Sequence, residues 1–180
     1  MNDDVFTFGD PLPKAPESAR PKILLTVDLV PMSSWQDNVR TRESKATWDR
    51  LRKATYRRAG YVCEVCGENG KDQGREWPVE CHEIWEYNEQ TRVQKLVGLI
   101  ALCPACHEVK HTGRTVKLGG QAARACVMAR LVRVNGWTPQ AAELHVREAF
   151  QVWERRSRQD WTLDLTFIEP FHGSSLPPSE

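Results

Sequence analysis

Two Cys-x2-Cys pairs constrain this chain more than any other feature of its sequence. Cys63 and Cys66 form the first pair, and Cys103 and Cys106 form the second. This spacing lets a tight turn present both thiolates of a pair to one ion, and four thiolates complete a tetrahedral Zn²⁺ site with no open position. The sequence therefore predicts a structural zinc ion whose binding contributes folding free energy to a small module.

The expected location of the chain favours metal binding by these cysteines. No apolar run approaches the length of a membrane span, and the first residues are acidic where a secretory signal is basic. We therefore expect a cytoplasmic protein with no membrane association, a reducing setting in which paired cysteines bind metal more readily than they form disulfides. No βαβ pattern surrounds either pair, which disfavours a redox role. Cys81 and Cys126 are interpreted as small packed side chains.

Three histidines lie next to the cysteine pairs. His107 and His111 stand at i and i+4 on the helix that the second pair opens, so they share one face. Adjacent helical residues project about 100° apart, so His107 faces a different compartment from Cys106. His82 lies on a predicted strand, where alternation places it on the same face as Glu80. Together His82, His107 and His111 predict a second, open site for a catalytic Mg²⁺, Mn²⁺, Ni²⁺ or Zn²⁺ ion.

Hydrophobic patterns, caps and turn residues predict the other elements. In chain order these are a strand over 22–30, a helix over 44–59, strands over 77–87 and 99–102, helices over 121–134 and from Thr138, and a strand over 161–167 able to pair with 22–30. The expected fold is α+β, with a small zinc-bound module flanked by helices and two outer strands.

The chain divides into five expected segments. They are a disordered, proline-rich arm (1–21), a strand and basic helix (22–60), the metal-binding module (61–112), C-terminal helices with a strand (113–169), and a disordered tail (170–180).

The charge of the chain indicates only local nucleic-acid contacts. Its net charge is +1 at pH 7, so there is no global electrostatic signature of DNA binding. Two basic runs, one before Cys63 and one around and after His111, nevertheless supply candidate phosphate contacts that are blind to base sequence. These candidates are Arg52, Lys53, Arg57, Arg58, Lys110, Arg114 and Lys117. DNA is the expected partner and RNA a second candidate, and the sequence does not predict the oligomeric state.

The order Cys-x2-Cys, strand histidine, Cys-x2-Cys-His-x3-His resembles the HNH endonuclease family of bacteria and phages, in its zinc-stabilised, treble-clef form. The resemblance covers residues 61–112. It implies a ββα-metal fold in which a hairpin and a helix hold one divalent cation against a scissile phosphodiester. It also implies that His82 and Glu83 occupy the place of the family's paired histidines, and that His107 and His111 match its helix histidines.

Two positions depart from the family pattern. Glu83 stands where many members have the histidine that deprotonates the attacking water, and Gly98 stands where the family has asparagine. Two catalytic assignments follow: His82 as general base with His107 and His111 as ligands, or His82 as ligand with Glu83 as base. A histidine pKa of about 6.5 suits a base at neutral pH better than a glutamate pKa of about 4.3, unless burial raises the latter.

The sequence thus predicts a metal-dependent endonuclease that hydrolyses phosphodiester bonds in DNA. The alternative is a non-catalytic, zinc-binding treble-clef module that binds nucleic acid or a protein partner. Gly98 favours the alternative, and the clustering of three histidines opposes it.

Overall fold

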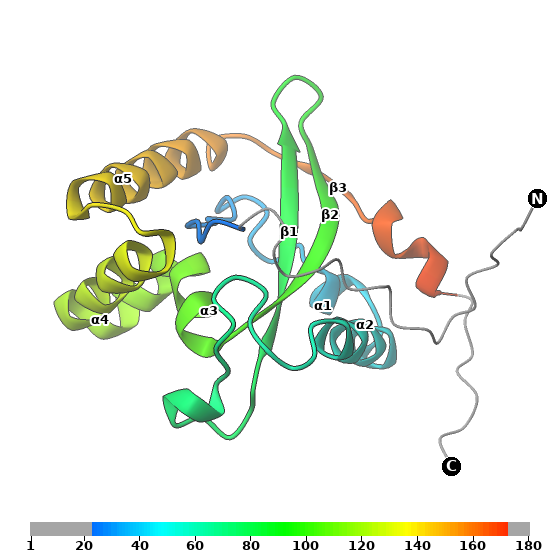
Figure 1. The fold of residues 1–180 in the computed structure, drawn as a ribbon. Helices are drawn as coiled ribbons and strands as arrows, with labels where there is room; N and C mark the ends of the chain where they lie inside the picture. The colour runs from blue at the N-terminus through cyan, green and yellow to red at the C-terminus, as the bar shows by residue number, and fades with distance from the viewer. Residues whose placement is uncertain (1–22, 173–180) are drawn as a thin grey trace, which may run out of the picture.

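A long β-hairpin organises the fold (Figure 1). In the computed structural model, which describes residues 23–172, β1 (Glu80–Asn88) pairs antiparallel with β2 (Val93–Leu102), with a bulge after Ile84. A short strand, β3 (Thr162–Asp164), lies parallel to β2, so the strand order is β1-β2-β3. The structure is therefore mixed α+β, with β1 at one edge of a three-stranded sheet.

Helices cover both faces of this hairpin (Figure 1). On one face lie α3 (Pro104–Lys110), α4 (Thr112–Asn135) and α5 (Pro139–Arg156); on the other lie α1 (Val39–Arg42), α2 (Lys45–Arg58) and the 3-10 helix η3 (Thr166–Phe171). A second 3-10 turn, η2 (Lys71–Gln73), precedes β1. Because strand side chains alternate, Ile100 packs into the core with α3 to α5, whereas Leu99 packs into the core with α1, α2 and η3.

Capping residues set the predicted helix boundaries. The Ser44 side chain accepts a hydrogen bond from the Thr47 amide and begins α2, which confirms the helix predicted over 44–59. The Thr138 side chain accepts from the Ala141 amide, with Pro139 at the first helical position of α5. Local sequence is therefore sufficient to place these two helices.

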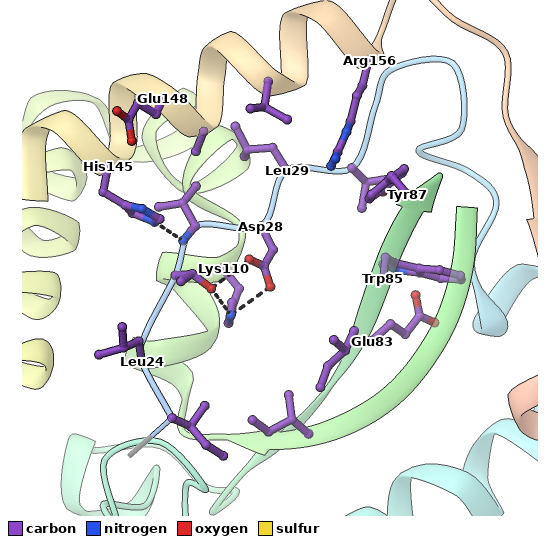
Figure 2. Close-up of a pocket in the computed structure, with 18 residues that line it drawn as sticks. Leu24, Asp28, Leu29, Glu83, Trp85, Tyr87, Lys110, His145, Glu148 and Arg156 are labelled. Atoms are coloured by element: carbon purple, nitrogen blue, oxygen red, sulfur yellow. Dashed lines mark hydrogen bonds and ion pairs between the residues drawn. The ribbon is translucent and has the colours of Figure 1, made fainter. Parts of the chain in front are cut away.

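The predicted strand over 22–30 is not part of the sheet. The backbone of residues 25–28 bonds to the helical layer instead (Figure 2). The Leu25 amide donates to Asn135 Oδ1 at 2.8 Å, the Val27 amide donates to His145 Nε2 at 2.9 Å, and the Asp28 amide donates to the Lys110 carbonyl at 3.1 Å. With these donors occupied, the C-terminal strand pairs with β2 rather than with this segment, contrary to the prediction.

Other boundaries differ by several residues. β2 begins well before the predicted 99, and α4 begins at Thr112, so the glycine-containing stretch before 121 is helical rather than a loop. Only Gly120, at φ 58°, leaves the helical conformation and kinks α4. At the C-terminus, Pro170 and Phe171 belong to η3, and Phe171 packs against the second core, so these residues do not belong to the predicted tail.

The predicted arm over 1–21 and the remainder of the tail, from 173, lie outside the described residues. Among residues 23–172, no helix combines the length and the apolar character that a bilayer crossing requires.

Candidate metal centres

The four cysteines of the two pairs meet in one cluster. The sulfur atoms of Cys63, Cys66, Cys103 and Cys106 all lie within 4.8 Å of one another, and those of Cys66 and Cys103 are 3.7 Å apart. Two thiolates that share a tetrahedral zinc at about 2.3 Å would stand at nearly this separation. The cluster can therefore bind a metal ion, and its all-sulfur donor set is compatible with zinc.

Local backbone geometry forms this cluster. In the first pair, the Gly67 amide donates to the Cys63 carbonyl at 2.9 Å, and Gly67 adopts φ 76°, a conformation that favours glycine. In the second pair, Cys103 is the N-cap of α3 and Pro104 occupies its first turn. A turn and a helix start thus present the two pairs to each other.

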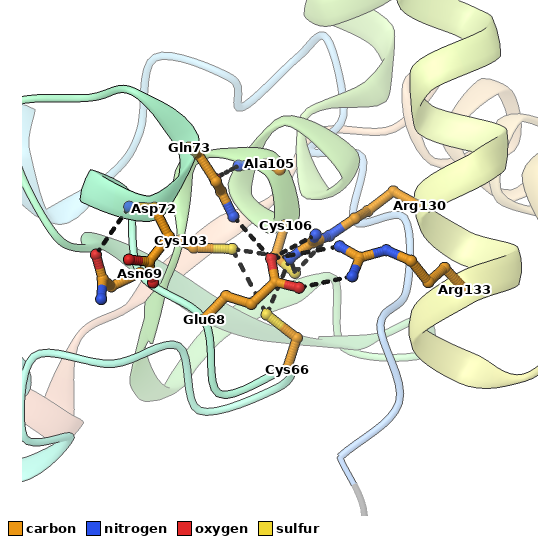
Figure 3. A network of polar contacts seen from close by, with 10 residues as sticks. All are labelled: Cys66, Glu68, Asn69, Asp72, Gln73, Cys103, Ala105, Cys106, Arg130 and Arg133. Carbon is orange, nitrogen blue, oxygen red and sulfur yellow. Dashed lines mark hydrogen bonds and ion pairs between the residues drawn. The ribbon is translucent and has the colours of Figure 1, made fainter.

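A buried arginine from α4 covers the sulfur atoms (Figure 3). Arg130 Nη2 donates to the sulfurs of Cys66, Cys103 and Cys106 at 2.9, 3.1 and 3.2 Å. Its Nη1 also donates to Glu68 Oε2 at 2.8 Å. Four thiolates around one Zn²⁺ carry a net negative charge, and a buried cation compensates it. The sequence alone does not connect Arg130 with the cysteines, because the two are distant in the chain.

The three predicted histidines also come together. One ring nitrogen from each of His82, His107 and His111 lies within 4.8 Å of the others, and Nε2 of His107 is 3.1 Å from Nε2 of His111. His82 is only 5% exposed, and its Nε2 has no hydrogen-bond partner among the described residues. Each of the three imidazoles can offer one ring nitrogen to a single divalent cation. The donor set therefore fits a metal ion.

Cys106 and His107 separate the two clusters within a single helical turn. The Cys106 sulfur lies in the core that α3 shares with α4 and α5, whereas His107 turns toward the strand. This is the divergence that helical geometry predicts for neighbouring residues.

Two carboxylates stand behind the histidines. A Glu80 carboxylate oxygen contacts Nδ1 of His107, and the carboxylate also accepts from the Trp77 indole N–H at 2.9 Å. The contact with His107 lowers the pKa of Glu80, and it leaves Nε2 of His107 for a cation. Asp28, which the sequence did not single out, lies with its Oδ2 3.5 Å from Nε2 of His82.

Burial favours the neutral imidazole in His82 and His111. It lowers the pKa of His82, and it lowers the pKa of His111 to about 3, with the neighbouring His107 acting in the same direction. Neutral imidazole is the form that binds metal ions.

Glu83 does not join the histidines. It projects from the opposite face of β1, where Cys81 and Trp85 pack against the second core. The Val39 amide donates to Glu83 Oε1 at 2.9 Å, and burial raises the pKa of the Glu83 carboxyl to about 7.

Gly98 leaves the histidine-bearing face without a side chain at the position where the family has asparagine. It pairs with Ile84, two residues along β1 from His82, and a Cβ added to it would lie 3.4 Å from Ile84 Cδ1. An asparagine at this position would therefore project on the face that carries His82.

The predicted basic residues fall into separate groups. Those of α2, Arg52, Lys53, Arg57 and Arg58, belong to a helix on the face of the hairpin opposite α3. Arg52 pairs with Asp49, and Arg58 pairs with Glu64. Arg114 and Lys117, in contrast, are exposed at the start of α4, and Arg114 is close enough to His111 to contribute to its lowered pKa. Of the predicted basic residues that are exposed, Arg114 is the one whose charge acts on a histidine of the cluster.

Lys110 is not the exposed phosphate contact that the sequence predicts. It is 7% exposed, and its ammonium donates to Thr26 Oγ1 and Asp28 Oδ2, both at 2.8 Å. It borders a cavity of about 530 Å³ between residues 23–30, β1 and α5 (Figure 2). Most of the cavity wall is apolar, so it does not form a basic groove for a phosphate backbone.

Comparison with protein-family models, with curated proteins and with solved structures finds no match for this chain. The resemblance to the HNH family therefore rests on the sequence motif in residues 61–112.

Proposed function

We propose that this chain is a metal-dependent HNH endonuclease that hydrolyses phosphodiester bonds in DNA. The observation that carries the proposal is the convergence of His82, His107 and His111 on one point, beside a closed cluster of four cysteines. A hairpin followed by a short helix is also the arrangement that the treble-clef, ββα-metal form of the family implies.

In this proposal the residues have distinct roles. His82, His107 and His111 hold one divalent cation, and Glu80 orients His107 through its Nδ1. When bound, the cation would polarise a phosphate oxygen and stabilise the charge that develops on the leaving oxygen. Three protein ligands leave room for water and substrate, unlike the four thiolates of the structural site.

Substrate contacts are assigned to the start of α4. Arg114 and Lys117 are exposed there, Arg114 acts on the charge of His111, and both can bind phosphates near the scissile one. The basic residues of α2 lie on the other face of the hairpin, so DNA bound at the histidines could contact them only by bending around the hairpin. We therefore assign them a weaker and more distant contact.

Glu83 is not assigned the role of general base. Its carboxylate accepts from the Val39 amide on the face of β1 that turns away from the histidines. His82 is retained in the cation site, because one of its ring nitrogens lies within 4.8 Å of those of His107 and His111.

Cleavage of a supercoiled plasmid tests the proposal. Zinc-loaded protein is assayed with Mg²⁺, Mn²⁺ or Ni²⁺, and wild type is compared with His82→Ala and His107→Ala. His172→Ala serves as a control, because His172 pairs with Glu43 away from the cluster. We expect cutting that depends on the added metal, falls by about 100-fold in the two cluster variants and is unchanged in the control.

Two outcomes contradict the proposal. Metal-dependent cutting that persists in both His82→Ala and His107→Ala would show that these histidines do not form the catalytic site. Absence of cutting with every metal, together with retained DNA binding, would instead support the non-catalytic zinc module, which the missing side chain at Gly98 favours.

A further inference from the structure

A carboxylate from outside the hairpin and its helix reaches the candidate catalytic centre. We infer that Asp28 is a positioning residue, which sets the orientation of the His82 ring and so shapes the cation site. The inference rests on the proposed function and extends the site beyond residues 61–112.

The Asp28 side chain is 39% exposed, and its carboxylate contacts two buried side chains, of which Figure 2 shows Lys110. Its Oδ2 lies 3.5 Å from Nε2 of His82 and 2.8 Å from Nζ of Lys110. Its Oδ1 accepts from the hydroxyl of Thr26 at 3.0 Å. Nε2 of His82 has no hydrogen bond of ordinary geometry among the described residues, and the Asp28 carboxylate is the group that faces it. Asp28 would therefore hold the ring at Nε2 and leave Nδ1 of His82 for the cation.

The C-terminal helices hold Asp28 in position. Asn135, at the end of α4, both donates to and accepts from the backbone of Leu25, at 2.8 Å in each case. His145 of α5 accepts from the Val27 amide. The Lys110 carbonyl accepts from the amide of Asp28 itself. This clamp explains why an irregular segment can place a carboxylate accurately, and it gives α4 and α5 a role in the site.

A carboxylate behind a ligating imidazole affects metal binding in a measurable way. Because an imidazole can rotate about two side-chain torsions, a fixed partner limits it to the orientation that binds the cation. Removing such a partner typically lowers metal affinity or activity by about 10- to 100-fold. Glu80 has this position relative to His107, and Asp28 has it relative to His82.

Asp28 has a second possible role, because its carboxylate also neutralises the buried ammonium of Lys110. A loss of metal binding in an Asp28 variant could therefore come from the unpaired Lys110 charge. A double variant separates the two roles. If Asp28 serves only Lys110, then removing both charges should restore normal metal binding, whereas a positioning role should leave binding weak.

The test is a titration of the zinc-loaded full chain with Mn²⁺, in which free Mn²⁺ is measured by electron paramagnetic resonance. The variants are Asp28→Asn, Lys110→Met and the double variant Asp28→Asn with Lys110→Met. Asp164→Asn is the matched control, because Asp164 pairs with Lys95 on β2, away from the histidines. Circular dichroism and zinc content establish that each variant is folded.

We expect Asp28→Asn to weaken Mn²⁺ binding by about tenfold or more, the double variant to remain weak, and the control to match wild type. Wild-type affinity in Asp28→Asn, or its recovery in the double variant, would overturn the positioning role while leaving the proposed function in place. Absence of Mn²⁺ binding by the wild type would overturn the inference, and the plasmid assay with Mg²⁺, Mn²⁺ or Ni²⁺ decides the proposed function separately.

Discussion

The cysteine cluster and the histidine cluster share helix α3 but differ in what surrounds them. The sulfurs of Cys63, Cys103 and Cys106 are buried, and Arg130 donates to three of the four thiolates. The histidine cluster has carboxylates behind it, and the side chain of His107 is 21% exposed. Four thiolates, three of them buried and all but one in contact with Arg130, form a closed site. Three imidazoles, with His107 partly exposed, leave positions for other molecules.

This difference predicts that Cys106 serves the stability of the fold, whereas its neighbour His107 serves metal binding in the open site. A closed site can contribute only to folding, so changes there should alter unfolding first. Changes in the open site should alter metal binding and leave the fold intact. The predictions below test this separation, in order of decreasing effect.

The largest effect is expected from Cys66→Ala. Zinc binding contributes on the order of 10 kcal/mol to small zinc modules, so loss of one thiolate should unfold residues 61–112. His107→Ala should keep zinc and secondary structure. Zinc content and circular dichroism of the two variants check this, and loss of zinc with intact structure in Cys66→Ala would contradict the division of roles.

A smaller loss is expected from Arg130→Met. This change leaves the thiolate cluster and Glu68 without their buried cation, and breaking a buried pair typically costs about 3–5 kcal/mol. Urea unfolding of zinc-loaded protein measures the loss. Arg130→Lys is the matched control, since it keeps the charge but not the forked donors, and it should fall between methionine and wild type. An unchanged free energy of unfolding in Arg130→Met would show that the hydrogen bonds from Arg130 to the sulfurs add no stability.

Glu83→Gln should change the pH dependence of stability and spare the histidine site. Burial raises the pKa of Glu83 from 4.5 to about 7, so the folded chain retains a proton that the unfolded chain releases. The stability from this group is full below pH 4.5 and falls as the pH rises through about 7, by about 3 kcal/mol in total.

The glutamine variant does not titrate and can still accept from the Val39 amide. Its stability advantage over wild type should therefore grow between about pH 5 and about pH 8, as urea unfolding would measure. Its Mn²⁺ affinity should match wild type. A tenfold loss of Mn²⁺ affinity in Glu83→Gln would instead place Glu83 in the cation site.

The smallest effect is expected from Asn135→Ala. It removes both hydrogen bonds to the Leu25 backbone and should cost about 1–3 kcal/mol. Zinc content should not change, while Mn²⁺ affinity should fall modestly because Asp28 is less firmly held. Equal Mn²⁺ affinity in variant and wild type would show that Asp28 keeps its position without this clamp.

Sequence spacing was sufficient for the parts of the fold that depend on neighbouring residues. Cys-x2-Cys spacing, the i, i+4 histidines and the caps Ser44 and Thr138 are local signals, and the structure has a helix or a cluster at each. Alternation also gave the correct face of β1 for His82, which shares it with Glu80 and not with Glu83.

Contacts between distant segments could not be predicted in this way. Arg130 reaches the thiolates and Asp28 reaches His82 only because of how the helices pack. The alternating pattern of residues 22–30 is compatible with a strand, but it does not show that Asn135 and His145 bond the backbone there. The sequence likewise predicts that a basic residue such as Lys110 is exposed, because it does not show that Asp28 pairs with it in the fold.

The placement of Cys106 beside His107 has a practical consequence for inhibition by chelators. In the proposed nuclease, a chelator that removes the cation from the three imidazoles should stop cutting quickly, and added Mg²⁺ or Mn²⁺ should restore it. Removing zinc from the thiolates should be slower and should dismantle α3, so that His107 and His111 lose their common face. A chelator would then inactivate the proposed nuclease in two phases, and only zinc resupply with refolding would reverse the second.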